Sequence, residues 1–225
     1  MNAVQGLGNP DPVLKFNVVV EDQIARFTEV RLLKRLDQGN LYLSHYHVVL
    51  TTLFHQTYSS PYTFARAAVN CDWRHAAAKE YLLQHAEEER AHWRWVLDDL
   101  GATDYAGLDP RTQPPHTSCQ AYIGLNYYIA EEVPVARLAI AAVLEGIGSR
   151  FGGMYGKKLL QVLRLKPSQA SFFLSHGETD KAHSEELRKI IAQSDFTPQE
   201  WTWMNHAALA AGQLYRGMYD HEGYA

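Results

Sequence analysis

Cysteine is scarce in this sequence, and long apolar runs are missing. Only Cys71 and Cys119 occur among 225 residues, which excludes a disulfide-rich scaffold and favours a cytoplasmic location. The most apolar stretch, VPVARLAIAAVLEGIG, is too short for a membrane span and contains Arg137 and Glu145. The first residues, MNAVQGLGNPDP, lack the basic and apolar segments of a secretory signal. We therefore expect a cytoplasmic protein that does not enter a membrane.

A concentration of charge of one sign is also missing. The formal net charge is −4, and lysine and arginine are spread along the chain. This distribution argues against nucleic acid or an anionic membrane as a partner. No Ser/Gly linker and no low-complexity segment divides the sequence. We expect residues 1–225 to form a single domain, with residues 1–11 as an irregular N-terminal segment.

Helical periodicity dominates what is present. Apolar residues recur at three- and four-residue steps, and no segment reads convincingly as a strand. Proline after a serine or threonine predicts helix starts at Ser60–Pro61 and Thr197–Pro198, and glycine predicts ends at Gly39 and Gly101. The expected helices lie near 12–38, 41–58, from 60 onward, 72–101 without interruption, 118–132, 134–163, 167–193 and 197–220. Glycines at 146, 148, 152 and 153 predict a kink or break. The sequence thus predicts an all-α bundle of about seven helices.

Chemistry-bearing residues stand out in the segment FFLSHGETDKAHSEELRKII. His176, Asp180 and His183 fall within a sector of about 60° of one helix, on the side of its apolar residues. Burying a carboxylate and two imidazoles is costly unless they are paired or bind a metal. Metal binding is one interpretation of this spacing, and mutual His–Asp hydrogen bonds are the other.

A similar pattern occurs in QHAEEERAHW. His85, Glu88, Glu89 and His92 share one helix face. Consecutive glutamates are typical of a solvated face, but His92 continues the apolar phase set by Leu82. We therefore expect His92 to point toward the core with one of the two glutamates beside it.

A lone acid, Glu145, lies in AIAAVLEGIG after a run of apolar residues. An unpaired buried glutamate is rare, so we expect it to meet the other polar groups. The resulting set of candidate metal ligands is Glu89, His92, Glu145, His176, Asp180 and His183. Three carboxylates and three neutral imidazoles around two divalent ions leave about one positive charge, and oxygen and nitrogen donors without thiolate favour iron or manganese over a structural zinc.

These marks, EERAH, LEG and HGETDKAH in order, make the sequence resemble the haem-oxygenase-like diiron oxidases and oxygenases, which share a scaffold with thiaminase II and pyrroloquinoline-quinone synthase. The resemblance covers roughly residues 20–215. It implies a haem-oxygenase-like bundle in which the six candidate residues hold two ferrous ions, one of them loosely. Some members place the first glutamate where His85 stands, so Glu88 and His85 stay open as alternatives to Glu89. His55 occupies a position where some members have a further glutamate, and its role is open.

The function that the resemblance implies is oxidation of a small organic substrate by dioxygen. Substrates in this family include fatty acids, amino acids and related amines or carboxylates, and the outcomes are desaturation, C–C cleavage or N-oxygenation. A homodimer is expected by analogy. The alternatives are a thiaminase II-like hydrolase with a cysteine nucleophile, a cofactorless oxidase on the same scaffold, and a non-catalytic small-molecule-binding protein. Neither cysteine has an evident base at fixed spacing. Arg150 is the nearest candidate for an anchor of a substrate carboxylate.

Overall fold

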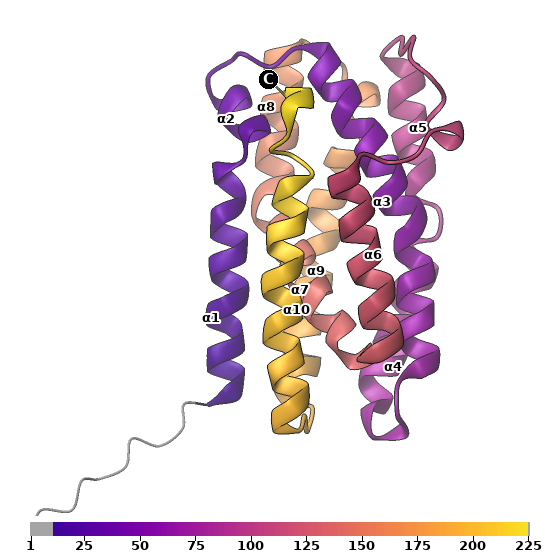
Figure 1. The fold of residues 1–225 in the computed structure, drawn as a ribbon. Helices are drawn as coiled ribbons and strands as arrows, with labels where there is room; N and C mark the ends of the chain where they lie inside the picture. The colour runs from indigo at the N-terminus through magenta and orange to yellow at the C-terminus, as the bar shows by residue number, and fades with distance from the viewer. Residues whose placement is uncertain (1–10, 225) are drawn as a thin grey trace, which may run out of the picture.

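A bundle of helices runs along the long axis of the molecule (Figure 1). The structure is a computed structural model that describes residues 11–224, apart from the side chains of residues 176–181. The helices in chain order are α1 (Pro12–Ala25), α2 (Arg31–Asp37), α3 (Leu43–Asn70), α4 (Ala76–Glu89), α5 (His92–Ala102), α6 (Thr117–Glu132), α7 (Arg137–Ile147), α8 (Gly153–Leu163), α9 (Ser171–Gln193) and α10 (Pro198–Gly217). No strand occurs in residues 11–224, so the predicted all-α class is confirmed. None of the described helices is long and apolar enough to cross a membrane.

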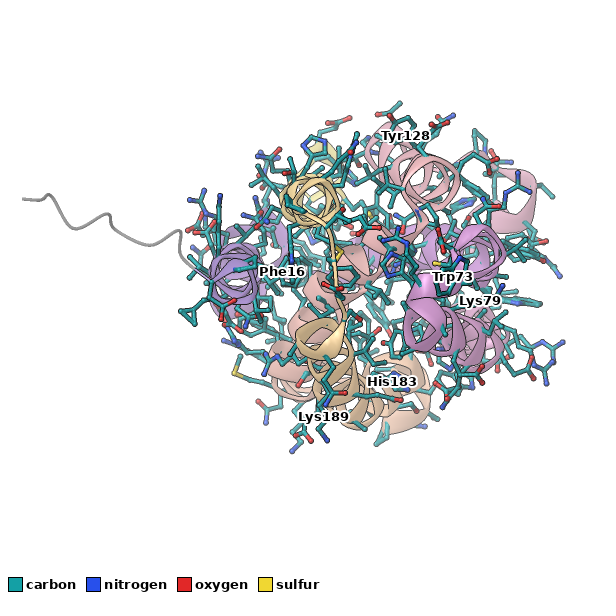
Figure 2. The ribbon with its side chains drawn as sticks, turned by 90° about the horizontal axis from the view of Figure 1, so that it is seen from below. Phe16, Trp73, Lys79, Tyr128, His183 and Lys189 are labelled. Atoms are coloured by element: carbon teal, nitrogen blue, oxygen red, sulfur yellow. The ribbon has the colours of Figure 1, made fainter. Side chains whose placement is uncertain are left out.

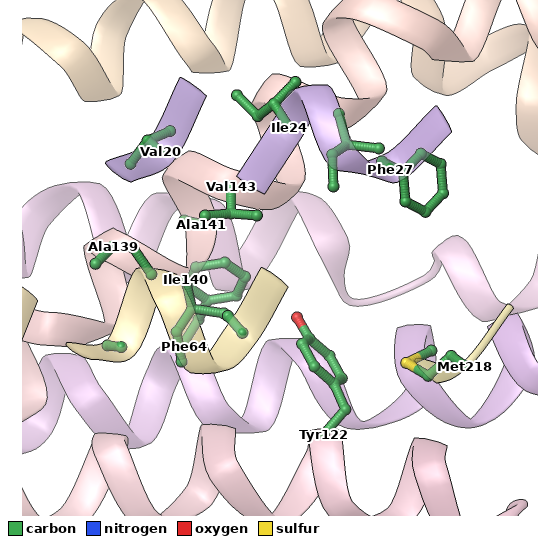
Figure 3. Packing of buried hydrophobic residues seen from close by; sticks show 14 of the residues in the cluster. Val20, Ile24, Phe27, Phe64, Tyr122, Ala139, Ile140, Ala141, Val143 and Met218 are labelled. Carbon is green, nitrogen blue, oxygen red and sulfur yellow. The ribbon is translucent and has the colours of Figure 1, made fainter. Parts of the chain in front are cut away.

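Helix α7 forms the centre of the bundle. Nearly all of its residues are buried, and it packs against α1, α9 and α10. Figure 3 shows Val20 and Ile24 of α1 beside Val143 of α7. A Cβ atom on Gly146 would overlap the tip of the Ile24 side chain, so the glycine lets α1 approach α7 closely without displacing Ile24. Viewed along the bundle, Tyr128 and Lys189 lie at the rim (Figure 2). The centre is mostly apolar, but α7 brings two buried charged residues into it, Arg137 and Glu145.

The expected helix over residues 12–38 is divided into two. Asp11 accepts a hydrogen bond from the Val13 N–H and begins α1, and Gly39 takes a positive φ of 72° after α2, as predicted. Between α1 and α2 lies a 3₁₀ turn, Arg26–Glu29, followed by extended backbone at Val30. The turn brings Phe27 into stacking contact with Tyr215 of α10. Core packing thus overrides continuous helical periodicity here.

The predicted helix start at Ser60–Pro61 is wrong, because α3 continues through Pro61 to Asn70. Proline removes one helical hydrogen bond and normally kinks or ends a helix. Here the Thr57 and Ser59 hydroxyls donate to carbonyl oxygens one turn back, at 2.8 Å each. Helix α3 also packs against α4, α5 and α6 along its length. This packing holds the helix together across the proline.

The predicted unbroken helix over 72–101 is also wrong. Asp72 caps a 3₁₀ turn, and then α4 ends at Glu89 and α5 begins at His92. Ala91 leaves the helical region with φ −120° and ψ 0°. The Trp93 indole N–H donates to the Arg90 carbonyl at 3.2 Å, while the Arg94 N–H bonds to the Ala91 carbonyl. The α-helix is therefore interrupted between Glu89 and His92.

Two further helix-end expectations have different outcomes. Helix α5 runs past Gly101 to Ala102, and Asp104 takes the left-handed conformation, with φ 52°, that was expected at Gly101. The glycine-rich segment after α7 forms a π-helical turn, Gly148–Gly152, so the predicted kink or break is a widened turn. Thr197 and Glu200 form the predicted cap at the start of α10.

Helix α9 is capped by a side chain from another helix. Its own preceding residue, Ala170, makes no side-chain cap. Asp99 of α5, fully buried, accepts hydrogen bonds from the Ser171 N–H at 2.9 Å, the Ser171 hydroxyl at 2.7 Å and the Phe172 N–H at 3.0 Å. Because the first N–H groups of a helix lack internal partners, this carboxylate fixes where α9 begins.

Replacing Asp99 by alanine tests this cap. The variant removes the acceptor of three hydrogen bonds, so we expect the free energy of unfolding to fall by about 1–3 kcal/mol. Chemical denaturation followed by circular dichroism measures the change. Asp98→Ala, at the exposed neighbouring position, is the matched control and should change stability by less than about 0.5 kcal/mol. Equal effects of the two substitutions would show that Asp99 does not hold α9.

Candidate metal centre

Two buried side chains and a partly buried one, from three helices, meet in the middle of the bundle. They are His85 of α4, Glu145 of α7 and His183 of α9, and one ligand atom of each lies within 4.8 Å of the other two. His85 Nε2 is 3.1 Å from Glu145 Oε1, and His183 Nδ1 is 3.6 Å from Glu145 Oε2. We call these three residues the central triad. Two of its members, Glu145 and His183, were predicted ligands, and His85 was an alternative.

Glu88 and Glu89 lie on different sides of the triad. Glu88 is the more exposed of the two, and its Oε2 lies 2.9 Å from His183 Nε2 and 4.0 Å from His85 Nδ1. Glu89 lines the same central cavity as His85 and Glu145. The structure thus brings both glutamates to the site, one at its rim and one at its cavity.

The break between α4 and α5 sets the positions of Glu89 and His92. His92 Nδ1 lies 2.9 Å from Glu89 Oε2, and the two side chains are mostly buried. The His92 ring stacks on Trp95, with ring centroids 4.4 Å apart. His92 therefore points inward beside Glu89, although the two residues do not belong to one continuous helix.

His176 and Asp180, the other two predicted ligands, belong to α9. Their side chains lie outside the described residues, so their part in the site stays a prediction.

The electrostatics of the triad depend on the Glu145 carboxylate. Burial alone would raise the pKa of Glu145, but its interactions with His183 and His85 outweigh burial and lower the pKa to about 2. Glu145 in turn raises the pKa of His183 above 6.5, against the opposing effect of burial, with Glu88 and Glu89 adding to the increase. In the metal-free site the neighbouring carboxylates therefore favour the protonated form of His183.

The donor atoms of the triad fit a metal ion. Glu145 Oε2, His85 Nδ1 and His183 Nδ1 are buried and make no hydrogen bond within the described residues, and unsatisfied buried polar atoms are costly. Metal–ligand bonds of about 2.0–2.2 Å place two ligands of one ion roughly 3–4 Å apart. The separation of 3.6 Å between two of these unsatisfied atoms, His183 Nδ1 and Glu145 Oε2, lies in that range. His85 lies 3.1 Å from Glu145 Oε1 through its other ring nitrogen, Nε2.

An apolar cavity of about 140 Å³ adjoins the triad. Phe27, Phe151, Phe172, Tyr215 and Tyr219 form much of its wall. Gln56 and Ser60 of α3 also line the cavity, together with Glu89 and Glu145. A small organic molecule can therefore lie next to the triad in surroundings that are mostly free of water.

His55 lies elsewhere. It is half-buried on α3 and lines a second cavity of about 470 Å³, together with His116, His221 and Glu222. Burial lowers the pKa of His55. The His116 and His221 rings stack nearly parallel, with centroids 3.9 Å apart. An ion between parallel rings would lie outside both ring planes, away from the nitrogen lone pairs, so this second cluster is a weaker metal site than the triad.

The arginine that lines the central cavity is not the one suggested by the sequence. Arg150, the predicted anchor candidate, pairs with Glu21 at 2.5 Å in a partly exposed position. Arg137, which was not proposed, is buried and lines the central cavity. Its signal in the sequence was the lone charge it places at the start of an apolar helix.

Comparison with known proteins decides the family. The model of the iron-containing redox enzyme family matches residues 47–215. The chain belongs to this family. The matched segment contains every residue of the central triad as well as Glu88, Glu89 and His92, so the family assignment rests on the part of the chain that forms the site. A search of curated protein sequences finds no match.

Solved structures share the fold of this family member. A protein from Shewanella denitrificans with a heme oxygenase-like fold has 17% identity and a TM-score of 0.77, covering 94% of this chain and 91% of its own. A TenA homolog from Pseudomonas syringae has 13% identity and a TM-score of 0.75, covering 97% of each chain. Heme oxygenase-1 from Synechocystis has 14% identity and a TM-score of 0.69, covering 92% and 90%. These likenesses confirm the predicted haem-oxygenase-like fold.

The triad predicts a specific pH dependence of the metal-free protein. His183 has a raised pKa and Glu145 a lowered one, so their pairing stabilises the fold fully between about pH 4.5 and pH 6.5. This stabilisation is lost as pH rises through the folded-state pKa of His183 or falls through that of Glu145. Glu145→Gln should return the His183 pKa toward its ordinary value, as measured by NMR titration with His183→Gln for assignment. Metal binding has the opposite dependence, because it requires the deprotonated imidazole, and should tighten as pH rises. An unchanged His183 pKa in Glu145→Gln would contradict this coupling.

Proposed function

We propose that this family member is a non-haem oxidase or oxygenase that holds two iron ions and uses dioxygen to oxidise a small organic substrate. The observation that carries the proposal is the convergence of His85, Glu145 and His183 at a buried point that adjoins an apolar cavity. Membership of the iron-containing redox enzyme family supports the choice of iron. Oxygen and nitrogen donors without thiolate agree with iron as well.

The residues proposed to hold the two ions are the predicted six, with His85 added from the structure. They are His85, Glu89, His92, Glu145, His176, Asp180 and His183. Glu88, which contacts His183 from the rim, is proposed to orient that imidazole. When bound, the iron ions supply the electrons that reduce dioxygen.

The chain's own groups supply orientation, charge and proton handling. Glu145 carries the negative charge that compensates a cation between α4 and α9, and His183 releases its proton when a metal binds. The aromatic wall excludes water and positions an apolar substrate beside the ligands. Each of these roles follows from burial and contacts of the described residues.

The triad favours a non-haem site over a haem. In haem the porphyrin occupies four positions around the iron, and protein side chains supply only the axial ligands. Three ligand atoms from α4, α7 and α9 that lie within 4.8 Å of one another are more than one haem face can use. Their arrangement therefore supports direct binding of metal by the protein.

The placement of the cysteines disfavours a thiaminase II-like hydrolase. Burial raises the pKa of Cys71 to about 11 and that of Cys119 to about 12. Neither residue belongs to the wall of the central cavity. A cysteine nucleophile acts as the thiolate, which needs a lowered pKa and access to substrate.

An anaerobic titration with ferrous iron tests the proposal. We expect wild-type protein to bind about two irons per chain, as the donor set implies, and to consume dioxygen afterwards with a change in visible absorbance. Glu145→Gln keeps the side-chain shape but removes the charge between the two histidines, so its iron affinity should fall by roughly tenfold or more. Equilibrium dialysis with metal analysis measures binding, and an oxygen electrode measures uptake.

Two controls accompany this titration. His116→Ala, in the second histidine cluster, should leave the tight binding unchanged, and the double variant Cys71→Ser/Cys119→Ser should keep the oxygen uptake. If wild type and Glu145→Gln bind the same amount of iron with the same affinity, the triad is excluded as the iron site. Iron-independent oxygen uptake would favour the cofactorless alternative.

A further inference from the structure

Arg137 is a buried charge in the wall of the central cavity. It is the first residue of α7, is only 1% exposed and is one of the largest fully buried side chains. It lines the same cavity as Glu145, eight residues further along the helix. Burying a guanidinium costs several kcal/mol unless its donors and charge are matched.

The internal contacts of Arg137 leave much of this cost uncompensated. Its Cζ lies 3.6 Å from the centre of the Phe64 ring, and its Nε donates to the Thr63 hydroxyl at 3.3 Å. Its Nη1 is buried without a hydrogen-bond partner, and the described residues place no carboxylate oxygen within 4.0 Å of the guanidinium. A guanidinium has five N–H donors, so most of its capacity is available to a molecule in the cavity.

Two carboxylates act on Arg137 from a greater distance. Burial lowers the pKa of Arg137, and the negative charges of Glu145 and Glu89 oppose this lowering. Both carboxylates have closer partners of their own, His85 and His183 for Glu145 and His92 for Glu89. The charge of Arg137 is therefore left without a partner at close range. The combination favours an anion at this end of the cavity.

The rest of the cavity wall has a different character. Arg137 is the only lysine or arginine among the described residues of this wall, and aromatic rings of Phe27, Phe151 and Tyr215 lie elsewhere on it. A ligand that matches both parts has one anionic group and an apolar body. Arginine binds carboxylates through two parallel hydrogen bonds, which also orients the molecule.

We propose that Arg137 is a specificity-determining residue that binds the carboxylate of the substrate, so that the cavity selects carboxylic acids with an apolar body over neutral analogues. This inference specifies the substrate class of the proposed oxidase. It rests on the proposed function only because it calls the bound ligand a substrate. The anion preference itself belongs to Arg137 and does not require iron.

Binding of octanoate and octanamide to the metal-free protein tests the inference. The two molecules have the same apolar chain and differ in the charge of the headgroup. Isothermal titration calorimetry at pH 7.5 should show that wild type binds octanoate roughly tenfold or more tightly than octanamide, because charge-assisted hydrogen bonds are stronger than neutral ones. Equal affinities in wild type would overturn the proposal without the need for any variant.

Variants separate the charge of Arg137 from its packing. Arg137→Met keeps the apolar volume against Phe64, and it should bind both molecules with similar affinity while octanamide binding stays within about threefold of wild type. Arg137→Lys keeps the charge but loses the paired hydrogen bonds, so it should retain part of the preference. Arg150→Met removes a partly exposed arginine instead and should keep the full preference. If Arg137→Met still binds octanoate more tightly than octanamide, a group other than Arg137 binds the anion.

The same measurements distinguish the two proposals. Repeating the titration with protein loaded anaerobically with Mn²⁺ should preserve the dependence on Arg137. If iron fails to bind but the acid preference of metal-free wild type is lost in Arg137→Met, the oxidase proposal fails and the anion site stands. If iron and oxygen chemistry are found without an acid preference, the oxidase stands and the role of Arg137 is rejected.

Discussion

The attraction of Glu145 to two imidazoles is the interaction on which the site depends. Glu145 lies on the most buried helix of the bundle, where an isolated carboxylate would favour its neutral form. His85 and His183, from α4 and α9, keep it ionised. Because each of the three residues belongs to a different helix, the triad also fixes how α4, α7 and α9 meet. The fold and the candidate metal centre are thus held by the same contacts.

Two interruptions of the regular helices lie next to the candidate site. The break at Ala91 separates Glu89 from His92, and the π-helical turn follows directly after α7. Both interruptions adjoin residues of the site. Backbone outside the helical region is often found at functional sites. Straight helices position the triad, and the interruptions shape what lies next to it.

Much of the architecture could be predicted from the sequence because helical periodicity and local caps are short-range signals. Thr197 with Glu200 and the positive φ of Gly39 are set by neighbouring residues. Pro61 and Ala91 could not be predicted, since the outcome at each depends on packing and on hydrogen bonds from Trp93 or the hydroxyls around the proline. The residues of the site divide in the same way. The apolar pattern of each separate helix predicted that Glu145 and His183 face inward. The contact of His85 with Glu145 and the burial of Arg137 depend on how distant helices pack together, so they could not be predicted.

The π-helical turn Gly148–Gly152 has a consequence for how the molecule can vary. One extra residue in a helical turn rotates everything after it by about 100° relative to a continuous α-helix. Phe151, Gly152 and Tyr155, at or beyond this turn, form cavity wall, while Glu145 lies before it in α7. Changes in the length or composition of this turn can therefore reshape the space for a ligand while the acidic group stays in place. The acidic group and this part of the cavity wall thus lie on opposite sides of the turn.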